Sequence, residues 1–214
     1  NFVFDFDLGS ELNLYGYEID KNKDTRINYI PTLTTKLSYP MIYSKNNYNM
    51  IVTPYLNFTG ITNIASSKDT TELIDAPNLY LTSFNFFNPN YYSGFDYAEK
   101  AMKLLYGFDY DLFSSRKLIN LFVGQVNYLN GNNNPNIAAY NLDNLNKNII
   151  SRISYFPNNA TELYYTSRLN AETFEPFRTD VGVKFSTIKS TMSLMVSSIK
   201  NIQQQFNVDL TSMG

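Results

Sequence analysis

Residues 1–16 read NFVFDFDLGSELNLYG, and their apolar side chains recur at every second position. Phe2, Phe4, Phe6 and Leu8 share one parity, whereas acidic and amide side chains occupy the other. Successive side chains of a strand point to opposite faces of its sheet. The spacing therefore predicts one long β-strand with an apolar face and an acidic face.

The period of two recurs along most of the chain, for example over residues 26–39, 50–58, 102–112 and 180–185. Short polar stretches separate these segments and read as turns. We therefore predict an all-β, antiparallel, up-and-down architecture with about nine or ten strands. Residues 61–98 and 130–147 break the pattern, since they are rich in Asn and Pro, and are expected to form long loops.

The composition argues against catalysis and metal chemistry. The 214 residues include no histidine and no cysteine, which excludes disulfides, thiolate zinc sites and a cysteine nucleophile. The net charge of −2 gives no attraction for nucleic acid. Asp5/Asp7 and Asp109/Asp111 form pairs on one strand face, as paired catalytic or calcium-binding acids do, but a solvated strand face gives the same pattern more often. We expect no enzyme activity, and no catalytic, cofactor-binding or metal-binding residue.

Alternation fits both a soluble β-sandwich and an outer-membrane barrel. The predicted strands are longer than the five or six residues that are about average in soluble proteins, and about 9–11 residues span a membrane. Aromatic residues lie near strand ends, as at Phe2, Tyr39, Tyr128 and Tyr155. Short turns also alternate with long loops. These features favour a transmembrane β-barrel, and we interpret residues 1–214 as a fragment of one barrel domain within a larger protein.

In that interpretation, the two parities meet different surroundings. The side chains predicted to face a polar lumen are Asp5, Asp7, Glu11, Asn13, Asn28, Thr32, Thr34, Lys36, Lys103, Asp109, Asp111, Arg152, Asp180 and Lys184. The side chains predicted to face membrane lipid are Phe2, Phe4, Phe6, Leu33, Leu37, Val52, Leu56, Leu104, Phe108, Val181 and Val183.

Pro31 and Pro54 lie within the alternating pattern, on the predicted lipid-facing parity. Proline cannot donate a ladder hydrogen bond and is usually confined to strand edges and bulges. We expect either that these strands are bulged or that they pair weakly, at a place where a seam could open.

Several short motifs, in order, resemble the barrel domain of the LptD family of lipopolysaccharide-assembly proteins. They are Arg26 and Pro31 in one strand, Thr53-Pro54 in the next, then Ser93, Gly94 and Asp96 in a loop, Tyr106-Gly107, and Gly124-Gln125. The order and approximate spacing agree over residues 25–125. Tyr92 and Tyr97 replace the arginines that flank the loop motif in the family, so a salt bridge made by those arginines is absent here.

The resemblance implies a segment of a large barrel in the outer membrane of a Gram-negative bacterium. Such a barrel is occupied by a plug lipoprotein of the LptE type, receives lipopolysaccharide from a periplasmic bridge protein, and releases it into the outer leaflet among the membrane lipids. It implies no bond chemistry. Two other interpretations stay open from the residues alone, namely a porin-like or uptake channel and a secreted β-rich binding domain.

Overall fold

The computed structural model describes residues 1–19, 22–62, 64–65, 81–91, 100–114, 117–130, 148–200 and 203–212. For residues 15–19, 22–26, 64–65, 117, 203–205, 210 and 212 it describes the backbone alone. No helix in these ranges is both long and apolar enough to cross a bilayer. Ser93, Gly94 and Asp96 of the loop motif lie outside the described residues, as do residues 131–147 of the second predicted loop.

Twelve strands form one sheet in the described part of the chain. The first five are β1 (Val3–Ile19), β2 (Asn22–Ser38), β3 (Met41–Lys45), β4 (Tyr48–Ile61) and β5 (Ile64–Ala65). The others are β6 (Ala101–Ser114), β7 (Lys117–Asn130), β8 (Asn148–Asn158), β9 (Thr161–Asn170), β10 (Pro176–Ser186), β11 (Ser190–Ile199) and β12 (Gln203–Ser212).

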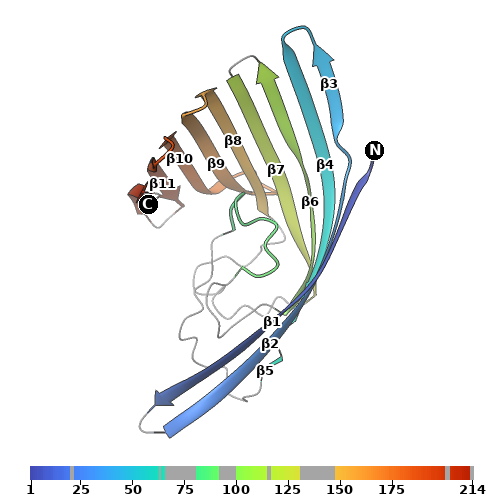
Figure 1. Cartoon of the computed structure of the whole chain (residues 1–214), viewed down its shortest axis with the longest axis vertical. Coiled ribbons are helices and arrows are strands. Elements are labelled where there is room, and N and C mark those ends of the chain that lie inside the picture. The colour runs from blue at the N-terminus through green and yellow to red at the C-terminus, as the bar shows by residue number, and fades with distance from the viewer. Residues whose placement is uncertain are drawn as a thin grey trace.

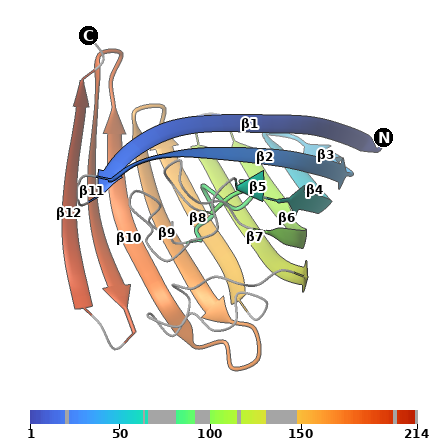
Figure 2. The ribbon, with the colours of Figure 1, turned by 90° about the horizontal axis from the view of Figure 1, so that it is seen from below.

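The strands follow one another across the sheet in the order β1-β2-β4-β6-β7-β8-β9-β10-β11-β12, and each ladder is antiparallel. Short β3 pairs with β4, and short β5 pairs with β2. The sheet is strongly curved and open, as Figures 1 and 2 show. This confirms the predicted all-β, up-and-down architecture of a partial barrel. No second sheet packs on the first among the described residues, which argues against a β-sandwich.

The connections define two ends of the sheet. Those of β3–β4, β6–β7, β8–β9 and β10–β11 are two to three residues long, at 46–47, 115–116, 159–160 and 187–189. The end that they form is called the short-turn end. The opposite, long-connection end carries residues 62–100 and 131–147 between strands. The connections between β4 and β9 alternate between short and long, whereas later connections are short at both ends.

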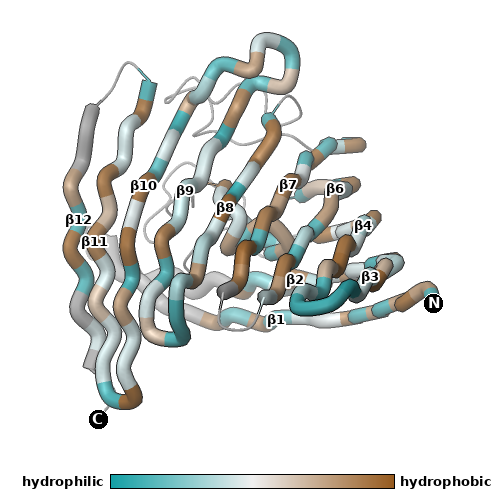
Figure 3. Tube along the Cα trace, turned by 90° about the horizontal axis from the view of Figure 1, so that it is seen from above, coloured by the Kyte–Doolittle hydropathy of each residue, from teal (hydrophilic) through white to brown (hydrophobic). Residues whose placement is uncertain are grey.

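Neighbouring registers sort the side chains into a concave and a convex face. On the convex face, one continuous row crosses eight strands and is formed by Val52, Tyr110, Leu121, Ile153, Tyr165, Val181, Val196 and Phe206. The next row is formed by Met50, Leu112, Ile119, Tyr155, Leu163, Val183, Leu194 and Val208. Figure 3 shows the resulting alternation of hydropathy along each strand.

Both prolines weaken one ladder without shifting its register. Ser38 lies opposite Tyr55 and Met41 opposite Val52, so by count Tyr39 stands opposite Pro54. The Tyr39 N–H donates to the Pro54 carbonyl at 3.1 Å, and the reciprocal bond is missing because Pro54 has no N–H. In the same way, Thr62 N–H donates to the Pro31 carbonyl at 3.3 Å without a return bond.

The prediction of a bulge at these prolines is therefore wrong, and the alternative, that the strands pair weakly there, stays a prediction. The β1–β2 and β4–β6 ladders pass Pro31 and Pro54 in register. Both prolines lack an N–H that would point from one strand of the β2–β4 pair to the other. Pro54 lies opposite Tyr39, just after β2 ends, and Pro31 lies opposite Thr62, just after β4 ends.

Candidate functional site

The concave face is the candidate site, because polar and charged side chains gather on it. One row across the sheet is formed by Thr53, Asp109, Phe122, Arg152, Thr166, Asp180 and Ser197. It lies directly beneath the apolar row of the convex face. The strand period thus gives this single sheet two chemically different sides.

Residues 81–91 pack against the concave face and are anchored there by aromatic rings. The Phe86 ring is fully buried, and its centroid lies 5.1 Å from that of Phe122 and 6.2 Å from that of Tyr55. Phe87 lies beside them, with its centroid 4.9 Å from that of Tyr55. Figure 2 shows this segment inside the curve of the sheet. It therefore narrows the space that the sheet partly encloses.

Two glycines on neighbouring strands make room for these rings. Gly107 and Gly124 stand opposite each other in the β6–β7 ladder. A Cβ atom on Gly124 would lie 2.6 Å from the Phe86 ring, and one on Gly107 would lie 2.6 Å from the Tyr55 hydroxyl. That hydroxyl donates to the Val123 carbonyl at 3.3 Å. Glycine is required at Gly124 because a side chain would displace the Phe86 ring, and at Gly107 because a Cβ atom would clash with the backbone carbonyl oxygen of Val123.

Lys103 holds the end of the same segment. Its side chain is fully buried on the concave face, and its ammonium donates to the Pro89 carbonyl at 2.6 Å. The ammonium also lies 3.8 Å from the centroid of the Tyr91 ring. The Tyr91 hydroxyl donates to the Phe86 carbonyl at 2.7 Å. A buried ammonium is tolerated here because a carbonyl and an aromatic face replace its hydration.

Beyond the aromatic cluster of Tyr55, Phe86 and Phe122, strands β8, β9 and β10 carry ion pairs on the concave face. Arg152 pairs with Glu162, which also accepts a hydrogen bond from Ser154 at 2.9 Å. The Arg152 guanidinium lies 4.3 Å from the Phe84 ring centroid. Asp180 accepts from Arg178 at 2.9 Å and, through its second oxygen, from the Thr166 hydroxyl at 3.0 Å. These groups can exchange hydrogen bonds with a polar ligand.

The N-terminal part of the concave face has fewer such contacts. Asp5, Asp7, Glu11 and Asn13 of β1 are exposed there. The Lys36 ammonium of β2 lies over the Phe87 ring, 4.3 Å from its centroid. On β6, Asp111 accepts from the Asn120 amide at 2.8 Å. This part of the face therefore presents acidic groups to the hollow of the sheet.

The registers give each sequence-predicted residue a face. The concave face carries Asp5, Asp7, Glu11, Asn13, Asn28, Thr32, Thr34, Lys36, Lys103, Asp109, Asp111, Arg152, Asp180 and Lys184. The convex face carries Phe4, Phe6, Leu33, Leu37, Val52, Leu56, Leu104, Phe108, Val181 and Val183. Phe2, just before β1, packs against Tyr39 with the rings tilted and their centroids 4.8 Å apart.

Sequence reasoning missed two features of the site. The concave face is partly apolar, since Leu105, Phe122 and Val126 are buried there beneath residues 81–91. The residues next to Phe122 are apolar on both sides, so the sequence does not indicate which face of the sheet this side chain takes. Tyr128, which was expected at a membrane interface, instead packs on this concave cluster.

The second missed feature lies on the convex face. Gln125 of the predicted family motif accepts a hydrogen bond from the Tyr106 hydroxyl at 2.9 Å, and the Asn127 amide donates to that hydroxyl at 3.4 Å. Nearby, Ser151 and Ser167 share a hydrogen bond of 2.8 Å. These polar pairs lie on the long-connection side of the two apolar rows and interrupt the apolar band on β6 to β9, whereas on β1, β2 and β4 apolar residues continue to Leu8, Leu33 and Phe58.

No three histidine, cysteine, aspartate or glutamate side chains in the described ranges gather closely enough to hold a metal ion. The site instead offers hydroxyls, amides and paired charges along a curved wall. Such a wall can bind and pass on a polar molecule.

A comparison with protein families matches residues 9–205 to the family LptD, described as LPS transport system D. A comparison with curated proteins finds no match. The family match covers most of the chain and agrees with the open antiparallel sheet and its two faces. The chain therefore belongs to the LptD family, whose members transport lipopolysaccharide into the outer membrane of Gram-negative bacteria and are not enzymes.

Proposed function

We propose that this chain forms one wall of the LptD barrel, with its convex face against membrane lipid and its concave face against the passage that carries the saccharide part of lipopolysaccharide. The observation that supports this most directly is the separation of the two faces from β4 to β12. Apolar rows, such as the one that crosses the sheet from Val52 of β4 to Phe206 of β12, cover one side. Asp109, Arg152 and Asp180 lie on the other side.

The dimensions of the strands support the same proposal. Strands β6 to β12 are 10 to 14 residues long, and a tilted spanning strand needs about 9–11. The sheet path ends at β1 and β12 among the described residues. In a barrel, both edges would pair with further strands, because an unpaired edge in hydrocarbon leaves backbone groups without hydrogen bonds.

The polar groups of the concave face suit a saccharide. Hydroxyl, amide and carboxylate side chains give many hydrogen bonds of similar strength, so a sugar chain can exchange one set for the next as it moves. Residues 81–91 cover the concave face over β4, β6 and β7 and reach β8, where Ile150 belongs to the same buried cluster. We expect the saccharide to pass beside this segment, along a wall that includes Thr34, Asp109, Arg152 and Asp180.

The exposed acidic side of β1 is where we place the plug lipoprotein of the LptE type. Asp5, Asp7 and Glu11 are solvent-accessible there, and residues 81–91 do not cover them. Lipopolysaccharide would arrive from a periplasmic bridge protein, as in the family.

Site-specific photo-crosslinking in intact envelopes tests the proposal. A photoreactive residue at Asp109 or Thr34 is expected to form adducts with lipopolysaccharide, and one at Asn13 with the plug lipoprotein. The matched controls are Phe108 and Leu14, which neighbour two of these residues and lie on the convex face. Absence of both adducts from all three concave positions, with the full-length protein present at normal levels, would overturn the transport route.

A further inference from the structure

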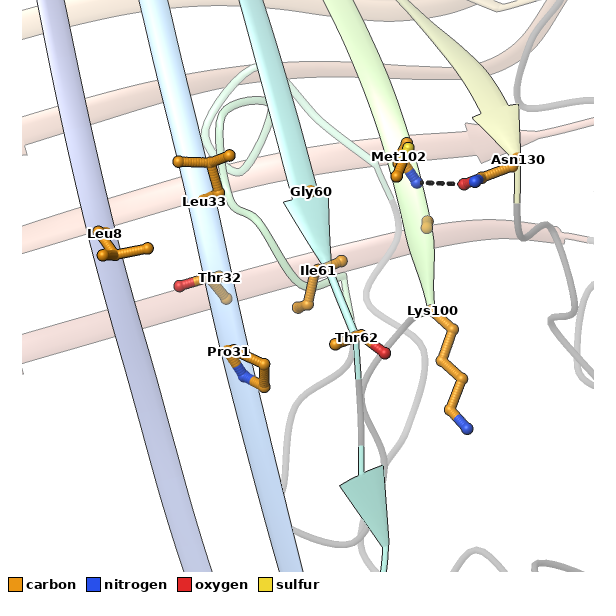
Figure 4. A pocket seen from close by; sticks show the side chains of 11 residues that line it. Leu8, Pro31, Thr32, Leu33, Gly60, Ile61, Thr62, Lys100, Met102 and Asn130 are labelled. Atoms are coloured by element: carbon orange, nitrogen blue, oxygen red, sulfur yellow. Dashed lines mark hydrogen bonds between the residues drawn. The ribbon is translucent and has the colours of Figure 1, made fainter.

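A pocket of about 460 Å³ opens at the long-connection end of the sheet, where β4 ends between β2 and β6 (Figure 4). Its lining is mostly apolar and comes from Leu8, Pro31, Thr32, Leu33, Gly60, Ile61, Thr62, Lys100, Ala101, Met102 and Asn130. The volume lies within the range of about 300–1,000 Å³ that is typical of small-molecule sites.

Much of the pocket lining belongs to the convex face, whereas Thr32, Ile61 and Ala101 have the parity of the concave face. The register aligns Leu8, Leu33, Gly60 and Met102 in one row across four strands, and Asn130 pairs with Met102 beyond a β-bulge. This row has the parity of Leu37 and Leu56, which are exposed on the convex side. The apolar walls of the pocket are therefore continuous with the apolar band of that face.

Gly60 creates the hollow. A Cβ atom on Gly60 would meet nothing nearer than the Phe58 ring, at 3.8 Å. Leu33 and Met102 flank the glycine on either side, so the missing side chain leaves a groove between them. A Cβ atom at this position makes only ordinary contacts, so we expect a larger side chain to extend into the groove.

The rim of the pocket is polar at the end away from the apolar band. Lys100 is exposed and extends past the end of β4 in Figure 4. Thr62 is exposed beside it. The side-chain Oδ1 of Asn130 accepts a hydrogen bond from the Met102 N–H at 2.8 Å, which leaves the NH₂ group of the same side chain as a donor at the rim. Among the residues described, none forms an ion pair with the Lys100 ammonium.

We propose that this pocket, called the Gly60 pocket, binds an acyl chain of a lipopolysaccharide molecule in the surrounding leaflet, with a phosphate of that molecule against Lys100. The inference rests on the proposed function in one respect, namely that the convex face contacts lipid. An apolar groove beside an exposed cation complements an amphiphile that has both an acyl chain and an anionic head.

The position of the pocket selects lipopolysaccharide over other lipids. In outer-membrane barrels, the longer loops lie on the external side, so the long-connection end faces the outer leaflet. That leaflet receives the lipopolysaccharide that this family transports, and its lipid anchor is acylated and phosphorylated. A free phosphate ion would gain nothing from the apolar walls, and an uncharged lipid would gain nothing from Lys100.

The test places a photoreactive residue at Met102 in the full-length protein and analyses its lipid adducts in intact envelopes. Lys100→Gln is expected to lower the yield of the lipopolysaccharide adduct about fivefold, which is the usual effect of one lysine beside an anionic lipid surface. Gly60→Leu is expected to lower it at least as much, because the new side chain occupies the groove.

Two control variants make the same kinds of substitution at positions away from the Gly60 pocket. Lys189→Gln removes an exposed lysine at the short-turn end, and Ser198→Leu adds a leucine to the convex face away from the pocket. Neither should change the Met102 adduct. The proposal is overturned if neither pocket variant lowers the yield, or if the adduct is a glycerophospholipid. The Asp109 crosslink tests the saccharide passage separately. If that crosslink fails, a Met102 adduct that decreases in Lys100→Gln still supports the pocket.

Discussion

The ring of Phe86 rests on Gly124, so closely that a Cβ atom added to the glycine would lie 2.6 Å from the ring. The two residues are separated by an entire hairpin in sequence. Their contact fixes residues 81–91 to the wall of the sheet, and the same contact decides which part of the concave face stays open.

Gly124→Val should dislodge Phe86 from this seat. Overpacking of a buried contact costs about 1–3 kcal/mol, and we expect a loss of that size in the free energy of unfolding. Urea titration of the full-length protein in lipid vesicles measures it. Gly60→Ala is the control, because a Cβ atom there meets only ordinary contacts. Equal stabilities of the two variants would contradict the close packing of Phe86 on Gly124.

Lys103→Met should release the end of residues 81–91 while leaving the sheet intact. The substitution keeps the length of the side chain but removes the ammonium that binds the Pro89 carbonyl and the Tyr91 ring. Hydrogen bonds to charged groups contribute about 1.5–3 kcal/mol, so amide exchange within residues 83–91 should become markedly faster. Lys189→Met, in an exposed turn, should leave that exchange unchanged. Exchange as slow as in the unmodified protein would show that Lys103 does not anchor the segment.

Leu194 and Met195 are neighbours on β11 with opposite faces, and they give a matched test of the convex surface. Leu194→Arg should lower the stability in membranes by about 2–4 kcal/mol, the cost of an arginine that faces lipid near the bilayer midplane. Met195→Arg should cost much less, because its side chain lies on the polar face. Refolding equilibria in lipid vesicles measure both. A larger penalty at Met195 would reverse the assignment of the faces.

Pro54→Thr should strengthen the contact between β2 and β4. The N–H of the new threonine can donate to the Tyr39 carbonyl. Residues 39 and 54 would then exchange two backbone hydrogen bonds, where the present protein has one. In the unmodified protein, the Tyr39 amide should exchange faster than the Leu37 amide, and Pro54→Thr should remove the difference. Val52→Thr introduces the same residue on the same face as a control. Uniform protection along β2 before the substitution would argue against a weak seam.

Much of the fold could be predicted because alternation is a local property of an extended chain. The period of two around Phe4, Leu56 or Val181 assigns each side chain to a face without any knowledge of distant residues. The registers then place the predicted polar set on the concave side and the predicted apolar set on the convex side. The order of the strands follows from short connections and antiparallel pairing.

Other parts of the site gave no such local signal. Phe122 lies in a run of apolar residues with no parity contrast, and it turns out to face the concave side. Pro31 and Pro54 were visible in the sequence, but only the pairing shows that both missing donors fall between β2 and β4.

The sequence by itself determined that the chain forms long two-faced strands, because a side chain's face depends only on its position along an extended backbone. The tertiary structure alone decided that Phe86 and Lys103 fix residues 81–91 within the hollow, and that Gly60 opens a pocket on the outside. Such contacts join residues that are far apart in sequence, and they form only when the completed sheet brings rings, glycines and charges within van der Waals reach.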